Sequence, residues 1–574
     1  MRLQINKTKN STSLYIVEST YDRHTGKRSN SVVKKLGTLK ELSEKYPDPI
    51  AWGKELAQKM TEEKNAGTLT ISVEYAPNLE KASFQEHLLM YGHLFLQKIY
   101  YSLGLDQICM KISQDYNFSY DLNEILKTLI YGRILFPASK LSTLKQAEKL
   151  LEPPSFELHD LYRALEVLTK ESDFIQSQLY LNSKEVMKRN DRILYYDCTN
   201  FYFEIEEEKG IRRYGKSKEH RPNPIVQLGL FMDADGIPLA FSIHPGNTNE
   251  QLTLKPLEEK IMGDFGKSKF VVCTDGGLSS ISNRKFNDRF GRAFITTQSL
   301  KKMKAWQKEW ALDPSGWRLP GSKREFNLND LLDSDELCDK YYNQCFYKER
   351  WFNENGLEQR YIVSFSLKYS AYTKKIREGQ VERAIKMVDR KQLARKGPND
   401  PGRFIDQVYF DENGQLCEDS QIYVNPEKIQ NEALYDGFYC TATNLSDDAE
   451  EIIKVNQRRW EIEESFRILK SEFKARPVFL SRDERIQAHF LICFLALHIF
   501  RLLEEQLGSK YTCQEITNAL RDMKVCDVPK KGFIPYYESC PVINDLHKFA
   551  GFSTNFQIIT LQNMKKIIRQ SKNR

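Results

Sequence analysis

The sequence lacks zinc-binding cysteine pairs, a membrane-spanning apolar run and internal repeats. Its eleven cysteines are scattered, without a C-x-x-C pair or a Cys/His cluster at zinc spacing, so we expect free thiols in a reducing compartment. The longest apolar run, AHFLICFLALHIF at 488–500, is too short to span a bilayer and is expected to be a buried core helix. The first residues, 1–15, are polar and basic, unlike a signal peptide.

Composition indicates a soluble, globular protein of several domains. Apolar residues make up 40% and charged residues 28% of 574 residues, too many for one hydrophobic core, so two to four domains are expected. The net charge of +7 equals the excess within residues 1–40. That segment carries the basic residues Arg2, Lys7, Lys9, Arg23, Lys27, Arg28, Lys34, Lys35 and Lys40 against Glu18 and Asp22. Such a segment suits a polyanion such as DNA, and ordinary solvation is the alternative.

The first two predicted segments are a small basic module and a helical domain. Residues 1–85 contain the alternating stretches SLYIVESTY and SNSVVKKLG around the turn DRHTGKR, which predicts a hairpin. A helix with Leu42, Trp52 and Leu56 is expected to follow. Residues 86–190 show apolar residues at helical spacing, which predicts a helical DNA-binding domain.

Residues 191–300 change to strand patterns. Strands are expected at 192–204, 224–232, 237–244, 269–274 and 293–297, with a hairpin turn DADG and a helix near 282–290. Three strands in a meander followed by helix-linked strands predict an α/β core, a mixed five-stranded sheet flanked by helices.

The rest of the chain reads as an insertion, a return to the core and a tail. Residues 301–445 mix short strand-like pieces with charged helical stretches. They hold Trp306, Trp310, Trp317 and Trp351. Residues 446–510 are expected to be the second part of the core, and 511–574 a helical basic tail that ends KKIIRQSKNR.

One helix, predicted over 452–473, carries two stripes. The apolar stripe that packs consists of Ile452, Val455, Ile462, Phe466, Leu469 and Phe473. The polar stripe, roughly 100° away, consists of Asn456, Arg459, Glu463, Arg467 and Lys470. A carboxylate between cations on one helix face is either a solvated ion-pair ladder or part of a site.

Three carboxylates are candidates for a metal site. Asp197 lies among apolar residues of the first strand, where a charge is costly without a partner. Asp275 ends another strand, before Gly276 and Gly277, which leave room for a ligand to approach the backbone. Either aspartate alone could be a hydrogen-bonded structural group. Together with Glu463 they form the oxygen-rich set that holds Mg²⁺, and two such ions can promote phosphodiester chemistry.

These residues resemble a known family. YYDCTNFYFE and FVVCTDGG resemble the two catalytic-aspartate strands of DDE transposases from bacterial insertion sequences, in the insertion-sequence-four superfamily. The segment N-x2-R-x3-E-x6-K at 456–470 resembles that family's Y-x2-R-x3-E-x6-K signature, with Asn456 in place of Tyr. The hairpin PNPIVQLGLFMDADGIPLAF with HPGNTNE after it, and RIQAHFLICFLALHIF, are most similar to the branch named for insertion sequence sixteen-thirty-four.

The resemblance implies an RNase H-like core interrupted by a mainly β insertion domain. It implies that Asp197, Asp275 and Glu463 bind two Mg²⁺ ions, for which Mn²⁺ can substitute, and carry out catalysis. Arg459 and Lys470 would contact phosphates near the scissile end. In relatives that make hairpin ends, a Trp of the insertion receives a flipped base; for each Trp here core packing is the alternative.

The DNA-binding set on the helix is completed by Arg467 and Asn456. Because Asn456 replaces the family's Tyr, an aromatic or phenolic contact from that position is not expected. The residues His244, Asn247 and Asn249, after the third strand, either approach the site or form an ordinary turn.

The predicted function is that of a transposase. It would bind terminal inverted repeats as a homodimer on double-stranded DNA, cleave the DNA, and transfer 3′ ends to target DNA by Mg²⁺-dependent phosphoryl transfer. It would act in the cytoplasm, at the nucleoid, without a membrane. The alternatives are an RNase H-fold nuclease without strand transfer, a DNA-binding derivative whose catalytic core has lapsed, and a glycosidase with paired carboxylates, which the cationic stripe disfavours.

Overall fold

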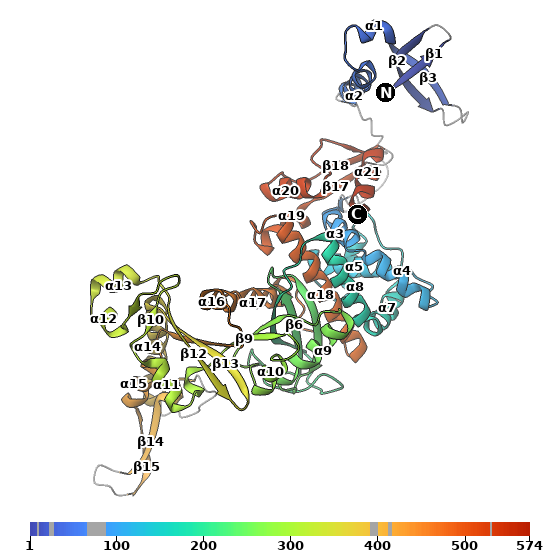
Figure 1. The fold of residues 1–574 in the computed structure, drawn as a ribbon. Helices are drawn as coiled ribbons and strands as arrows, with labels where there is room; N and C mark the ends of the chain where they lie inside the picture. The colour runs from blue at the N-terminus through green and yellow to red at the C-terminus, as the bar shows by residue number, and fades with distance from the viewer. Residues whose placement is uncertain (9–10, 22–27, 66–87, 391–399, 411–415, 529–530) are drawn as a thin grey trace. The chain divides into compact units, whose positions relative to one another are not determined.

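The structure, a computed structural model, describes residues 1–8, 11–21, 28–65, 88–390, 400–410, 416–528 and 531–574 (Figure 1). The chain forms two compact units, Met1–Lys81 and Ala82–Arg574. The six expected segments are thus grouped into two units, with the boundary close to the predicted end of the N-terminal module.

The first unit is a three-stranded antiparallel sheet with two helices. Its elements are β1 (Arg2–Lys7), β2 (Thr12–Tyr21), β3 (Arg28–Thr38), α1 (Leu39–Ser43) and α2 (Pro49–Asn65). The expected hairpin is present as β2 and β3, and its turn lies outside the described residues. The single helix expected here is two helices, because Thr38 caps α1 and Asp48 accepts hydrogen bonds from the first backbone amides around Pro49.

The central sheet of the second unit contains the five expected strands. They are β5 (Ile193–Tyr202), β6 (Ile225–Asp233), β7 (Pro238–Pro245), β8 (Val271–Thr274) and β9 (Ala293–Thr297). Their order is β7-β6-β5-β8-β9, in which β5, β6 and β7 are an antiparallel meander and β5, β8 and β9 run parallel. The parallel strands are joined through α9 (Leu254–Asp264) and α10 (Ile281–Phe286), as parallel neighbours require. The expected meander and helix-linked strands are confirmed.

The sheet does not stop at five strands. At the free edge of β9 it continues through β16 (Phe438–Thr443), β13 (Leu357–Phe365), β12 (Phe346–Glu354), β10 (Trp317–Arg318) and β11 (Glu325–Phe326), giving ten strands. The five-stranded expectation is therefore incomplete, because the unpaired edge of β9 is covered by strands of the insertion.

The insertion is also less β-rich than expected. It contains α11 (Ala305–Leu312), α12 (Leu328–Leu332), α13 (Asp335–Tyr341), α14 (Leu367–Asp389) and α15 (Pro426–Ala433). A separate hairpin, β14 (Ile405–Phe410) and β15 (Leu416–Val424), extends from it (Figure 1). The insertion is an α+β elaboration of the central sheet.

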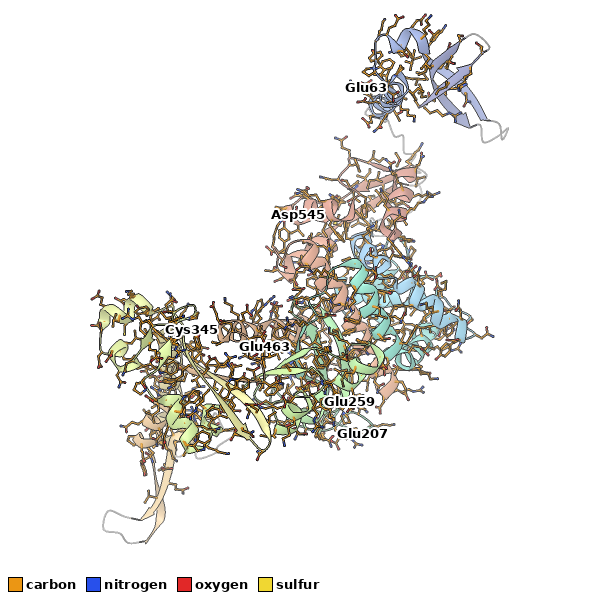
Figure 2. The ribbon with its side chains drawn as sticks, viewed as in Figure 1. Glu63, Glu207, Glu259, Cys345, Glu463 and Asp545 are labelled. Atoms are coloured by element: carbon orange, nitrogen blue, oxygen red, sulfur yellow. The ribbon has the colours of Figure 1, made fainter. Side chains whose placement is uncertain are left out.

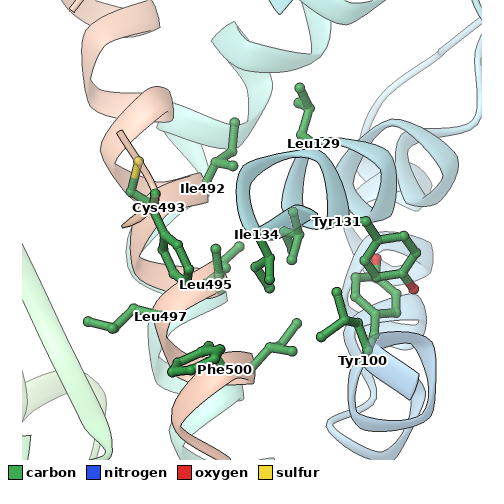
Figure 3. Close-up of a cluster of buried hydrophobic side chains, with 14 of the residues drawn as sticks. Tyr100, Leu129, Tyr131, Ile134, Ile492, Cys493, Leu495, Leu497 and Phe500 are labelled. Carbon is green, nitrogen blue, oxygen red and sulfur yellow. The ribbon is translucent and has the colours of Figure 1, made fainter. Parts of the chain in front are cut away.

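The expected helical domain is not an independent core. Its helices are α3 (His93–Ser102), α4 (Leu105–Asp115), α5 (Leu122–Leu135), α6 (Lys140–Ala147), α7 (Leu158–Lys170) and α8 (Ser172–Val186). Their buried residues belong to the same hydrophobic cluster as α18 (Asp483–Gln506) and one face of the central sheet. Figure 3 shows part of this cluster, with Leu129 and Ile134 of α5 on the side of Ile492 and Leu495 of α18.

The expected C-terminal tail is folded into the same unit. It consists of α19 (Cys513–Asp522), β17 (Lys524–Val528), β18 (Gly532–Pro535), α20 (Pro541–Ala550), β19 (Ile559–Thr560) and α21 (Leu561–Lys572). Strand β4 (Leu88–Met90), from the start of the helical region, completes a four-stranded sheet in the order β19-β18-β17-β4. The first strand of this unit therefore pairs with strands from its C-terminal region.

Helix α18 is long and apolar enough to cross a membrane by composition. However, 89% of its most apolar window is buried inside the protein. Burial on all sides is typical of a core helix, as the sequence predicts.

Replacing Leu495 with Ala should destabilise the second unit by about 3 kcal/mol, because the leucine is fully buried in this cluster and its loss leaves a cavity. Urea unfolding followed by circular dichroism measures the shift. The matched control is Leu181→Ala, since Leu181 is 44% exposed. Equal midpoints for the two variants would contradict the central role of α18.

Candidate active site

The sheet register places Asp197 and Asp275 next to each other. In the parallel pair of β5 and β8, Tyr196 lies opposite Thr274, so the two aspartates that follow emerge at the same level. Each of two neighbouring carboxylates disfavours the ionised form of the other, because like charges repel. Burial raises the pKa of Asp197 to about 6, and the charge of Asp275 adds to the effect, against Lys218, the Cys198 amide and Arg459, which lower it.

Asp197 lies on the sheet face that α17 (Trp460–Arg467) covers. Side chains alternate along a strand, so Asp197 shares its face with Phe201. Phe201 belongs to the hydrophobic cluster that contains Ile462 and Phe466 of α17. The buried stripe of the predicted helix therefore packs next to the aspartate pair.

The predicted helix over 452–473 is three helical segments. They are α16 (Ala449–Gln457), α17, and η5 (Ile468–Glu472), a π-helical turn. The chain tightens between the first two, where the amides of Arg459, Glu461 and Ile462 bond to carbonyls three residues back. The tight turn and the wide turn change the direction of each successive side chain, so the five polar residues do not share one face.

Arg459 connects three parts of the site. Its Nη2 lies 3.1 Å from Asp275 Oδ1, and its Nη1 donates to Thr297 Oγ1 at 3.0 Å. Burial is the largest influence and opposes the charge on Arg459. Asp275 and, more weakly, Cys273, Tyr439 and Asp197 together outweigh it, so the pKa of the guanidinium lies above its ordinary value. The guanidinium thus neutralises one of the two adjacent aspartates.

Lys470 and Lys218 supply positive charge beside Asp197. Burial, and then the charge of Lys218, lower the pKa of Lys470 to about 8, while Asp197 opposes the shift. Lys218 donates to the carbonyl of Cys198, and its Nζ lies 3.3 Å from Glu250 Oε1. The loop that carries Lys218 is held by Asn200, whose Oδ1 accepts from the Lys218 amide at 3.3 Å.

Lys218 and Glu250 were not predicted as site residues. Lys218 belongs to the polar stretch YGKSKEHRP between β5 and β6, and Glu250 ends the motif HPGNTNE. Two features of the sequence could have indicated them: the many charges of YGKSKEHRP, and the position of Glu250 directly after β7. Neither pattern shows which strand the loop folds over.

Glu463 lies apart from the aspartate pair. It is exposed on α17 and lines a cavity of about 480 Å³ with Arg459, Trp460 and Tyr439, between the helix and the insertion. Figure 2 labels Glu463 on the helical side and Cys345, which also lines the cavity, on the insertion side. Within the described ranges, no three His, Cys, Asp or Glu side chains form a group that could hold a metal ion.

Asn456 and Arg467 occupy opposite environments. The Asn456 side chain is buried and donates to Tyr439 Oη at 3.1 Å and to Thr441 Oγ1 at 3.2 Å, which uses both amide hydrogens. It joins α16 to β16 and presents no free donor to DNA, unlike the predicted role. Arg467 is exposed and pairs with Glu464, with Nε 2.7 Å from Oε2.

The loop after β7 is mostly structural. His244 is opposite Gln227 in the sheet, which places it on the face away from Asp197, where its ring hydrogen-bonds Ser242 at 2.8 Å. Asn249 caps a short helix by accepting from the amide of Gln251. His244 therefore belongs to strand β7 itself, and the expected ordinary turn describes Asn249.

The insertion tryptophans differ in exposure. Trp317 is fully buried and donates to the carbonyl of Asp313 at 2.9 Å, so it is a core residue. Trp306 and Trp351 are 48% and 44% exposed. Trp460, on α17 itself, is 61% exposed and lines the cavity beside Glu463.

Comparison with known proteins gives one family match. Residues 189–499 match the family model described as "Transposase DDE domain". No curated protein matches the chain.

Among solved structures, the chain is similar to a piggyBac transposase synaptic complex with hairpin DNA, at 8% identity and TM-score 0.35, over 84% of this chain and 85% of that one. It is also similar to a Mos1 transposase paired-end complex with left transposon end, at 12% identity and TM-score 0.13, over 43% and 68%. At these scores neither likeness bears on the fold or the function of this chain.

Replacing Asp197 with Asn should stabilise the metal-free protein by an amount that increases from pH 4 to about pH 6 and is constant above. The folded state holds the Asp197 proton up to about pH 6, whereas the unfolded state releases it near pH 4, so rising pH penalises the wild type in this window. Thermal unfolding in EDTA across this range measures it. Asp264→Asn, at an exposed site on α9, is the control. A pH-independent difference at Asp197 would contradict the assignment.

Proposed function

The chain belongs to the transposase DDE domain family, and from this premise we propose that it is the transposase of a bacterial insertion sequence. It binds the terminal inverted repeats of its element, cleaves the DNA there and transfers the 3′ ends to target DNA. One observation carries the proposal. Asp197 and Asp275 follow paired residues of neighbouring parallel strands, so they lie at the same height in the sheet, near Arg459 and Lys470.

The strand order supports an RNase H-like core within this proposal. A meander of β5, β6 and β7 with β8 and β9 parallel to β5 gives the mixed arrangement that the sequence resemblance implies. The motif segments support placement in the insertion-sequence-four superfamily, in the branch named for insertion sequence sixteen-thirty-four.

The aspartate pair fits a divalent cation. Two carboxylates at one level, one of them buried enough to raise its pKa to about 6, leave negative charge that a metal would offset. Their ligand atoms are oxygens, which Mg²⁺ prefers and Mn²⁺ also accepts. Asp197 and Asp275 would hold one ion, and Glu463, which lies apart from the pair, would have to approach it to complete a second site. When bound, these ions stabilise the attacking and leaving oxygens of a phosphodiester.

The chain's own cations would position the DNA. Arg459 offers a planar set of donors suited to a phosphate, and Lys470 keeps most of its charge at neutral pH because its pKa is about 8. Arg467, exposed about two turns after Arg459, would contact the backbone more weakly. Asn456 is reassigned from DNA contact to support of α16.

Pairing two DNA ends requires two protein copies, so the active form is proposed to be a homodimer on DNA. The basic N-terminal unit would add phosphate contacts whose strength decreases steeply with salt. The protein would act at the nucleoid in the cytoplasm.

Replacing Asp197 or Glu463 with Ala should abolish cleavage and preserve end binding. Loss of a metal ligand removes several kcal/mol of transition-state stabilisation, so the rate should decrease about a thousandfold or more. The assay uses Mg²⁺, a duplex carrying the element's own terminal repeat, and a target plasmid. It scores binding, nicking and joining separately.

Glu451→Ala, at an exposed site on α16, is the matched control and should cleave like wild type. Retained cleavage by the Asp197 variant would refute the active site. Cleavage without joining would identify a nuclease, and binding without cleavage by wild type would identify a lapsed DNA-binding derivative.

A further inference from the structure

A second cavity lies between the helical region and the segment that follows η5. Its volume is about 240 Å³. The loop between α5 and α6 forms one wall, and residues 474–480 form the other, with His489 of α18 at its base. Its position at the far end of β5 follows from the bridge between Phe203 and Val478.

The cavity is lined by cations and by no acid. Its basic lining residues are Arg133, Lys140, Lys474, Arg476 and His489, and no Asp or Glu among the described residues lines it. Lys140 and Arg133 are 5% and 4% exposed, so both are buried charges. Two buried cations side by side without a carboxylate are costly unless an anion joins them.

The buried cations Arg133 and Lys140 differ in their hydrogen bonds. Arg133 donates to the carbonyls of Phe473 at 3.0 Å and Ala138 at 3.5 Å, which joins the two walls, while its Nε has no partner. The Nζ of Lys140 meets no acceptor among the described side chains and carbonyls, and it borders the cavity. Burial, followed by the charge of Arg133, lowers the pKa of Lys140 to about 7. Lys140 is therefore a buried, unpartnered donor directed at an open space.

Positive charge connects this cavity with the aspartate pair. Lys470 and Arg476 both pair with Glu219, and Arg476 lies 5.8 Å over the ring of Tyr202. From Asp197 to Tyr202 the strand advances about 17 Å, at roughly 3.3 Å per residue. The cavity therefore lies well away from the aspartate pair, toward the end of the same strand.

We propose that this cavity, the Lys140 pocket, binds one backbone phosphate of the DNA whose scissile end lies at Asp197. The inference depends on the proposed function, because it assigns a contact to the same DNA. Lys140 donates to the phosphate, and Arg133 adds positive charge behind it. The apolar walls, including Pro477 and Leu480, exclude water and strengthen the interaction. The pocket fixes the duplex at one phosphate away from the point of cleavage.

The test compares Lys140→Met with wild type on terminal-repeat duplexes in which single phosphates are replaced, one at a time, by neutral methylphosphonate. Wild type should lose about tenfold in affinity at one position other than the scissile phosphate, the expected worth of one charge-assisted contact. The variant should bind the unmodified duplex about tenfold more weakly and show no further loss at that position.

Two measurements keep the result interpretable. Removing an uncompensated buried charge should leave the DNA-free Lys140→Met protein at least as heat-stable as wild type, so weaker binding cannot be assigned to misfolding. Lys145→Met removes one charge from the exposed side of the same helix α6 and should bind like wild type.

Each outcome has a distinct meaning. If wild type and Lys140→Met lose affinity equally at every methylphosphonate position, the pocket is a structural cavity and the inference is refuted while DNA binding stands. If wild type does not bind the repeat duplex at all, the proposed function fails instead. Stabilisation of wild type by inorganic phosphate, without any methylphosphonate effect, would show a site for free phosphate and overturn the assignment to DNA.

Discussion

The register between β5 and β8 is the constraint on which the site depends. It brings two carboxylates to one level of the sheet, where they repel each other and where burial already disfavours charge on Asp197. The surrounding structure compensates with cations from three different segments: Arg459 from the turn before α17, Lys218 from the loop after β5, and Lys470 from η5. A one-residue slip of β8 would move Asp275 to the opposite face and leave these cations without their partner.

The sequence was sufficient for the five central strands. Alternating apolar residues and the DADG turn define β5, β6 and β7, and the short apolar runs of β8 and β9 end at recognisable polar residues. Local periodicity reports such features because they are determined by neighbouring residues. The edge pairing of β9 with β16 joins residues far apart in the chain, and no local pattern specifies it.

The contrast between local patterns and distant contacts also explains which features of the site the sequence did not predict. The spacing of Arg459, Glu463 and Lys470 predicts one helix face, but the tight turn near Arg459 and the wide turn of η5 change their directions. The burial of Asn456 depends on Tyr439 and Thr441, which the insertion supplies. The charge of Lys218 acts on Asp197 from a loop that Asn200 and the Cys198 carbonyl hold against the strand. Each of these depends on a contact between distant segments.

Arg459 links the state of the aspartate pair to the insertion. Its guanidinium pairs with Asp275 and bonds Thr297, and Thr297 in turn hydrogen-bonds Tyr439 of β16 at 2.5 Å. A divalent cation at Asp275 would compete with the guanidinium for the same carboxylate and repel it at short range. Arg459 also borders the cavity that contains Glu463, so a shift away from Asp275 would carry its charge toward Glu463 and the insertion. In the proposed enzyme, metal binding at Asp275 would therefore free Arg459 for contact with a DNA phosphate.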